Sequence, residues 1–247
     1  MATLQVAFSL IKNYTMQARE DYLSLFEGNF ITDAAVMKNK LRSIKAFIFD
    51  WDGVFNNGQK NMEGHSGFSE VDSMGINLLR FNTYLFQKQI PLTAIITGEK
   101  NGLALSFAER ENFNSIYYKV KNKETALLHF CKQHQLVPSE ILFVFDDILD
   151  FSVAKLVGLR MMIGRRSNPL ILEYAQQQRL VDYISYHDGE TNALREITEL
   201  CLLLTNNFQK VLELRMKFSE EYKTYISKRN EVDTVSYSAI ADEIVKV

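Results

Sequence analysis

The feature that most constrains the fold is a series of short, almost continuously apolar segments between residues 45 and 186. Stretches long enough for a helix separate most of them. In order, these segments are "AFIFD", "LTAIIT", "SIYY", "ILFVFD", "LRMMIG" and "VDYIS". Strands that are apolar on both faces are typical of a parallel sheet buried between two layers of helices. The sequence therefore predicts an α/β fold with a doubly wound, Rossmann-like parallel sheet over residues 44–190.

This alternation is interrupted between residues 54 and 71, where no helical pattern follows the first strand. The segments "NNGQ" and "EGHSG" supply turn-forming residues, and the residues beside them can pair. The sequence therefore predicts a β-hairpin inserted after the first strand.

Additional segments flank the core on both sides. Residues 1–43 predict a helical extension, which includes a short helix from an N-cap at Asp33 through Leu41. Residues 191–247 predict a C-terminal helical extension, dominated by one long helix that ends near residue 229. Such a helix would be longer than a core of this size, so we expect it to pack on the N-terminal helices, on another subunit, or on both.

Composition excludes several classes of protein. A net charge of −2 and a pI of about 6.1 give no general attraction to nucleic acid or to an anionic membrane. No apolar run approaches the roughly 20 residues that span a bilayer. The two cysteines, Cys131 and Cys201, form no metal-ligand pattern, which favours a reducing compartment. We therefore expect a cytoplasmic protein with no nucleic-acid or membrane partner.

The functional prediction begins with "KAFIFDWDGVF", residues 45–55, in which an apolar strand ends in two acids and a glycine. Taken alone, this stretch fits a surface turn that carries two solvated carboxylates. It also fits a metal-assisted reaction centre, because crowded carboxylates at a low-dielectric place need a cation or a proton between them. The residues at the other strand ends decide between the two, because ligands bind beyond the carboxyl ends of strands in such sheets.

Polar residues follow four of the predicted strands. They are Asp50 and Asp52 after the first, Thr97 and Gly98 after the second, Lys123 after the third, and Asp146 and Asp147 after the fourth. A lysine in the first turn of a helix opposes the helix dipole, which suggests a role outside the helix. Each residue alone has an ordinary structural explanation, but together at one edge they predict a reaction centre.

This set of residues suits phosphoryl transfer. An aspartate can attack phosphorus and form an aspartyl-phosphate, while a second acid protonates the leaving oxygen and later activates water. Mg²⁺ prefers oxygen ligands and would explain the convergence of several carboxylates. A hydroxyl, a backbone amide and a lysine can bind the phosphate oxygens on which charge develops.

The motifs "DWDG", "IITG", "KNK" and "FDDILD", in this order, resemble the four motifs of the haloacid dehalogenase superfamily. Residues 44 to about 204 are similar to its capless subfamily of 3-deoxy-D-manno-octulosonate 8-phosphate phosphatases, through "DGVFNNG", "GINLLR" and "NALREITELCLLL". The resemblance implies an Mg²⁺-dependent phosphoric monoester hydrolase. Its substrate would be a small phosphorylated metabolite such as a sugar or sugar-acid phosphate.

The resemblance also implies roles for individual residues. Asp50 would be the nucleophile and Asp52 the general acid and base. Phosphate would be bound by Thr97, Gly98 and Lys123.

The same resemblance implies a metal site and an assembly. The side chains of Asp50 and Asp146 and the backbone carbonyl of Asp52 would hold Mg²⁺. The hairpins of four subunits would pack into a homotetramer, and a homodimer is the alternative, because two-fold association is the commonest symmetry.

Two positions depart from the family pattern. Val71 stands where the family has an arginine, and Glu99 replaces the arginine that follows its "TG" pair. The glycine-rich segment before "AVRE" has also become "GETNALRE". Because guanidinium groups suit a sugar-acid carboxylate, we expect a preference for a neutral sugar phosphate or for a substrate whose carboxylate lies elsewhere. A second hypothesis stays open, in which the fold serves as an assembly or regulatory module with little or no turnover.

Overall fold

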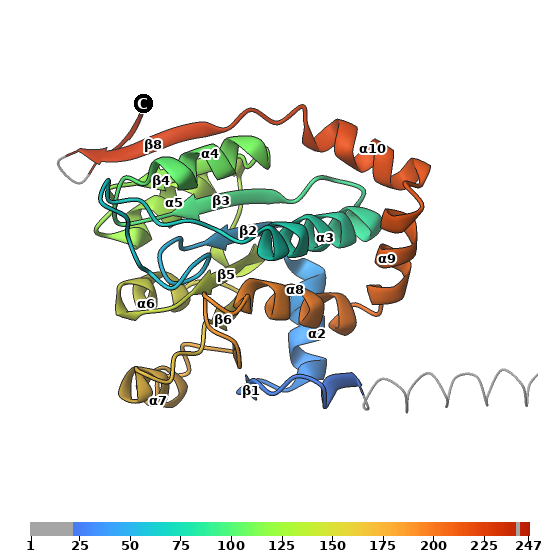
Figure 1. The fold of residues 1–247 in the computed structure, drawn as a ribbon, viewed down its shortest axis with the longest axis horizontal. Coiled ribbons are helices and arrows are strands. Elements are labelled where there is room, and N and C mark those ends of the chain that lie inside the picture. The colour runs from blue at the N-terminus through green and yellow to red at the C-terminus, as the bar shows by residue number, and fades with distance from the viewer. Residues whose placement is uncertain (1–21, 241–242) are drawn as a thin grey trace, which may run out of the picture.

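The computed structural model describes residues 22–240 and 243–247, which form one sheet with helices on both faces (Figure 1). The strands are β1 (Asn29–Phe30), β2 (Ala46–Phe49), β3 (Leu92–Ile96), β4 (Ser115–Tyr118), β5 (Ile141–Phe145), β6 (Leu159–Met162), β7 (Tyr183–Ile184), β8 (Val235–Ile240) and β9 (Glu243–Lys246). The α-helices are α2 (Ala34–Ser43), α3 (Glu70–Gln87), α4 (Gly102–Arg110), α5 (Lys123–His134), α6 (Phe151–Ala154), α7 (Pro169–Gln177), α8 (Ala193–Leu204), α9 (Phe208–Met216) and α10 (Glu220–Arg229).

The sheet has the strand order β1-β7-β6-β5-β2-β3-β4-β8-β9. The two outermost pairs, β1 with β7 and β8 with β9, are antiparallel, and every other neighbouring pair is parallel. All six strands predicted from the sequence are present, so the predicted doubly wound α/β fold is confirmed.

Alternate residues of each central strand face opposite layers of the core, as a period of two requires. In β2, Phe47 and Phe49 join one hydrophobic cluster with residues of α2, α3, α4 and α8 to α10. Ala46 and Ile48 join the other cluster, with residues of α5, α6 and α7. The strands are therefore buried on both faces, which explains their nearly continuous apolar sequences.

The segment predicted as a hairpin contains no strand. Residues 54–69 form a series of turns, closed at the tip by a backbone hydrogen bond of 2.8 Å from Asn61 N to His65 O. The side chains of Asn56 and Asn57 accept backbone N–H groups two residues ahead, which stabilises turns rather than a ladder. An isolated two-stranded ribbon is also marginal in water, so the prediction of a hairpin within the chain is wrong.

The predicted long C-terminal helix is three helices, α8, α9 and α10. The chain bends where Asn206 and Phe218 adopt positive φ angles of 61° and 46°, at which an α-helix cannot continue. Ser219 then caps α10 by accepting the amide of Tyr222. The shorter helices fold back, and α8, α9 and α10 all contact α3. The apolar stripe is thus buried against the chain's own core, and α8 also contacts α2.

Three strand pairings at the ends of the described chain have no counterpart in the predicted fold. β1 pairs with β7, β8 pairs with β4, and β9 pairs with β8. Tyr237 of β8 stacks on Tyr117 of β4, with ring centroids 4.8 Å apart. The alternating sequence "VSYSAI" of β8 is the signal that could have predicted this strand.

The N-terminal prediction is testable only in part. Asp33 caps α2 as predicted, accepting the amide of Ala35 at 2.7 Å. The helix predicted before this point falls almost entirely on residues 1–21, outside the described part of the chain. No helix within residues 22–240 or 243–247 has the length and hydropathy of a bilayer-spanning segment.

Candidate active site

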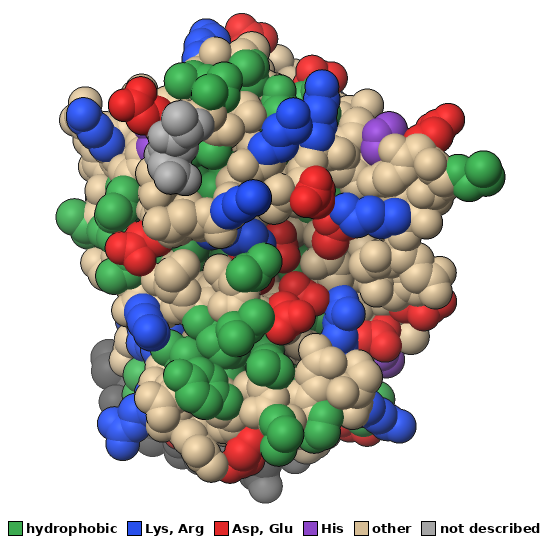
Figure 2. Space-filling view, turned by 90° about the vertical axis from the view of Figure 1, so that its left-hand side faces the viewer, with side chains coloured by type: hydrophobic (Ala, Val, Ile, Leu, Met, Phe, Trp, Pro, Cys, Tyr) green, Lys and Arg blue, Asp and Glu red, His purple; other side chains and the backbone are tan. Residues whose placement is uncertain are grey.

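The predicted site residues lie at one edge of the sheet. The four strands that precede them, β5, β2, β3 and β4, are neighbours in this order and run parallel, so their carboxyl ends meet. These strands point to the left in Figure 1, and Figure 2 views that side. Acidic and basic side chains gather near the middle of this face, with hydrophobic side chains beneath them (Figure 2).

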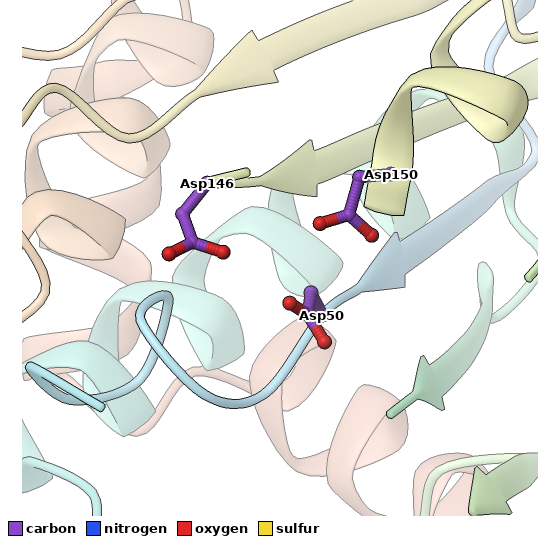
Figure 3. A group of neighbouring side chains, drawn as sticks. All are labelled: Asp50, Asp146 and Asp150. Carbon is purple, nitrogen blue, oxygen red and sulfur yellow. The ribbon is translucent and has the colours of Figure 1, made fainter. Parts of the chain in front are cut away.

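Three buried aspartates converge at this edge (Figure 3). Asp50 follows β2, Asp146 follows β5, and Asp150 ends the 3-10 turn Ile148–Asp150. Each offers one carboxylate oxygen within 4.8 Å of the other two. Burial, and then the charge of Asp50, raises the pKa of Asp146 to about 8 and that of Asp150 to about 7. Three crowded carboxylates need positive charge beside them to stay ionised. A hard divalent cation such as Mg²⁺ can supply that charge.

Lys123 joins this cluster from the first turn of α5. Its ammonium lies 2.7 Å from Asp50 Oδ1 and 2.6 Å from Asp150 Oδ1, and its side chain is only 3% exposed. Burial alone would lower the pKa of Lys123, but the two carboxylates outweigh it, and the pKa is raised. The lysine is therefore charged, and its unfavourable place at a helix start is offset by two ion pairs.

Gly53 explains why a glycine follows the two acids of "DWDG". Its φ is +90°, and a Cβ atom there would overlap Asp146 Oδ2 and Arg165 Nη2. Only glycine accepts both this backbone conformation and this close approach. The loop after β2 can therefore pass directly beside the carboxylate cluster.

The carboxylate of Asp52 is not one of the three that converge, and it contacts the loop formed by residues 54–69. Its carboxylate accepts a hydrogen bond from Ser66 Oγ and lies 3.1 Å from the ammonium of Lys60. The hydroxyl of Ser66 in turn accepts hydrogen bonds from Trp51 Nε1 and Asn101 Nδ2, at 3.1 Å and 2.8 Å. The loop thus holds Asp52 separately from Asp50.

Thr97 and Gly98 end β3, the strand next to β2. Thr97 is buried, and its backbone is tied to the neighbouring strand end by hydrogen bonds to Tyr117 and Val120. Gly98 is half-buried, and a Cβ atom added to it would have only one atom, the carbonyl oxygen of Val120, within 4 Å. The backbone at Gly98 is therefore open to a ligand, and Thr97 lies directly before it.

The structure brings Asp50, Asp146 and Lys123 together as predicted. Asp147 lies outside the cluster, where its side chain accepts the amide of Ile148. Sequence reasoning missed Asp150, although it is the last acid of "FDDILD", one helical turn after Asp146.

Three contacts near the site had no clear sequence signal. Ser66 and Lys60 reach Asp52 from the loop, and Arg165, after β6, lies 2.9 Å from Asp146 Oδ2. No periodic pattern pairs these residues with the acids, so only the folded chain shows that they are in contact.

Comparisons with known proteins give relatives but no family model that matches. A 3-deoxy-D-manno-octulosonate 8-phosphate phosphatase KdsC from Salmonella typhi is 28% identical over 169 residues, which is 66% of this chain and 82% of that protein. The KdsC phosphatase of Yersinia pestis is 27% identical over 172 residues, 68% of this chain and 84% of that protein.

Solved structures similar to this chain are also phosphatases or hydrolases of this superfamily. A hydrolase of the HAD superfamily, subfamily III A, from Legionella pneumophila is 25% identical, with a TM-score of 0.61 over 74% of this chain and 94% of that one. The chain has the haloacid dehalogenase fold. The octulosonate phosphatase of Moraxella catarrhalis, solved with magnesium, phosphate and KDO, is 26% identical, with a TM-score of 0.60 over 72% of this chain and 97% of that one.

These similarities confirm the predicted resemblance to the haloacid dehalogenase superfamily and to its phosphoric monoester hydrolases. The predicted cofactor, Mg²⁺, accords with the Moraxella complex and with the three converging carboxylates of this chain. The roles of individual residues remain predictions.

Proposed function

We propose that the chain is an Mg²⁺-dependent phosphatase that hydrolyses a small sugar phosphate or sugar-acid phosphate through an aspartyl-phosphate on Asp50. The observation that carries this proposal is the buried cluster of Asp50, Asp146, Asp150 and Lys123 at the carboxyl edge of the sheet. The names of the KdsC relatives support the class of reaction and of substrate.

In this proposal the side chains of Asp50, Asp146 and Asp150 would hold Mg²⁺, with the backbone carbonyl of Asp52 as a further ligand. Bound Mg²⁺ would offset the negative charge of the nucleophile and of the phosphate. Lys123 holds Asp50 in place and offers its remaining N–H to a phosphate oxygen, because an ammonium has three donors and two already face carboxylates.

The reaction proceeds in two displacements at phosphorus. A carboxylate oxygen of Asp50 attacks, the bond from phosphorus to the ester oxygen breaks, and protonated Asp52 gives its proton to that oxygen. Water then attacks phosphorus and gives a proton to Asp52. The bond from phosphorus to the Asp50 oxygen breaks, so phosphate is released and the Asp50 carboxylate is regenerated. Thr97, the amide of Gly98 and Lys123 bind the phosphate oxygens in both steps.

Asp52 is separated from the other acids in a way that suits this role. The hydroxyl of Ser66 and the ammonium of Lys60 fix its carboxylate at the wall of the loop, while its main chain stays beside Asp50. A general acid must act on the leaving group rather than bind the metal through its side chain, and the Asp52 side chain is not one of the three converging carboxylates.

The alternative is a module of this fold with little turnover. The contact between Arg165 and Asp146 favours it, because a guanidinium beside a metal ligand competes with a cation for that carboxylate. The two proposals differ in one measurable property, the rate of phosphate release with Mg²⁺ present.

The test is a screen of sugar phosphates and sugar-acid phosphates with Mg²⁺, run beside the Asp50→Asn variant. The proposal expects turnover by the wild type and its loss in the variant, whose amide is nearly isosteric but cannot form the acyl-phosphate. Near-wild-type activity in Asp50→Asn would exclude this mechanism. No turnover of any substrate by the folded wild-type chain would favour the alternative.

We also propose a cytoplasmic homo-oligomer, a tetramer or otherwise a dimer, with no nucleic-acid or membrane partner. Both Cys131 and Cys201 are buried free thiols, which agrees with a reducing compartment.

A further inference from the structure

A cavity of about 600 Å³ adjoins the candidate active site. Its walls come from the segments that follow β6 and β7 and from the loop after β2, among them Arg165, Arg166, Tyr186 and Asn57. Arg165 also lies 2.9 Å from Asp146, so one guanidinium lines the cavity and contacts the carboxylate cluster. A substrate whose phosphate is bound at the cluster can therefore extend into this cavity.

The charge of this cavity is carried mainly by the two arginines. Asp188 is the acid in its wall, and its Oδ1 accepts hydrogen bonds from the backbone amides of Glu190 and Thr191 and from the Thr191 hydroxyl. That carboxylate thus stabilises its own turn. The charge of Arg165 is shared with Asp146.

Arg166 has no such acidic partner. Within the described residues no carboxylate lies within 4.0 Å of its guanidinium, and its contacts are to the Tyr186 hydroxyl at 3.3 Å and to the Tyr186 ring, 5.8 Å from its centroid. A neutral tyrosine positions this guanidinium by stacking without cancelling its charge. An uncompensated arginine held at the wall of a cavity beside an active site is suited to bind an anion.

We propose that Arg166, together with Arg165, is a specificity-determining residue that binds a second anionic group of the substrate, remote from the scissile phosphate. This inference rests on the proposed phosphatase function. Arg165 and Arg166, which follow β6, would then take the place of the arginines that the family pattern has where this chain has Val71 and Glu99. The preferred substrate then carries a carboxylate or a second phosphate at the end that enters the cavity.

Two matched pairs of substrates test the proposal. D-gluconate 6-phosphate and D-glucitol 6-phosphate differ only in a carboxylate against a hydroxymethyl group, and α-D-glucose 1,6-bisphosphate and D-glucose 6-phosphate differ in a second phosphate. The readout is the ratio of kcat/KM within each pair, measured with Mg²⁺ for the wild type and for Arg166→Gln. Arg42→Gln, an exposed arginine on α2, is the control.

We expect the wild type and Arg42→Gln to favour the more anionic member of at least one pair by about tenfold or more, a scale typical of one charge-assisted contact. Arg166→Gln should bring that ratio close to one, mainly through a higher KM. The pair that responds identifies carboxylate or phosphate as the second anion.

Ratios near one in both pairs for an active wild type would overturn this inference and leave the phosphatase proposal intact. An equal loss of activity on both members of a pair in Arg166→Gln would also overturn it. Inactivity of the wild type on all four substrates and in the wider screen would overturn both proposals.

Discussion

The ammonium of Lys123 lies 2.6 Å from the carboxylate of Asp150, and both side chains are almost completely buried. Asp150 is therefore more than a third acid beside the metal site. By pairing with Lys123, which also contacts Asp50, it helps to fix the lysine that holds the proposed nucleophile. This pair links the end of β4 to the segment after β5 across β2 and β3, so the site depends on the register of four strands.

Replacement of Lys123 by methionine should lower both activity and stability. Two buried carboxylates would lose their cationic partner, which costs about 3 kcal/mol or more of unfolding free energy. Phosphate would lose a charged donor, which lowers kcat by about a hundredfold or more. Urea unfolding and steady-state kinetics check both effects. Lys121→Met, two residues earlier and exposed, is the control and should change neither.

Replacement of Asp150 by asparagine should weaken Mg²⁺ binding by about tenfold or more, because the cluster loses one of three negative charges. Isothermal titration calorimetry with Mg²⁺ on the folded variant measures the change. The control is Asp147→Asn, because Asp147 lies outside the cluster and an asparagine can still accept the Ile148 amide. Equal Mg²⁺ affinity in the two variants would remove Asp150 from the proposed metal site.

Replacement of Gly53 by alanine should abolish activity, because the new methyl group would overlap the Asp146 carboxylate and the Arg165 guanidinium. Gly64→Ala is a matched control. Gly64 also has a positive φ, +80°, but no atom lies within 4 Å of the added carbon. The control should therefore show only the backbone strain, about 1 kcal/mol of stability. If both variants retained full activity, the close approach at Gly53 would not matter to the site.

Much of this architecture could be predicted because it follows from local patterns. Burial on both faces makes the central strands apolar, and the rule that ligands bind at carboxyl ends is enough to place Asp50, Asp146 and Lys123 together from the sequence alone. The cap of α2 at Asp33 could also be predicted from the sequence, because its hydrogen bonds are made within three residues.

The remaining features depend on contacts that no local pattern encodes. The break between α8 and α9 needs only one residue, Asn206, in a left-handed conformation, and the apolar stripe continues across it. Asp150 and Arg165 reach the site through the path of the chain after β5 and β6. The loop of residues 54–69 is held by single hydrogen bonds such as Ser66 to Asp52, which leave no periodic signal.

The proposed homo-oligomer predicts a particle mass above that of one 28.5-kDa chain, about fourfold for a tetramer and twofold for a dimer. Apolar side chains exposed on α7 and on the segment after β5 offer a contact surface, because exposed apolar groups often mark interfaces. They are Ile148, Leu149, Leu170 and Tyr174. Light scattering after size-exclusion chromatography should show the mass fall in Leu170→Lys but not in Leu128→Lys, on α5. A wild-type mass near 28.5 kDa at micromolar concentration would contradict assembly.

Asp182, directly before β7, anchors α2 and β6 near one edge of the sheet. Its fully buried carboxylate accepts hydrogen bonds from Thr32, Lys40 and Arg160. Burial would raise its pKa, but these hydrogen bonds outweigh that effect and lower the pKa to about 2.

The unfolded chain, with an ordinary aspartate pKa near 4, binds this proton more readily than the folded chain. Stability from Asp182 is therefore complete above about pH 5 and is lost as the pH falls through about 2, the folded pKa, by about 2 kcal/mol in total. Urea unfolding at a series of pH values should show that the stability difference between wild type and Asp182→Asn shrinks on acidification. A difference independent of pH would mean that folding does not change the pKa of Asp182, and would contradict the stabilising hydrogen bonds to its carboxylate.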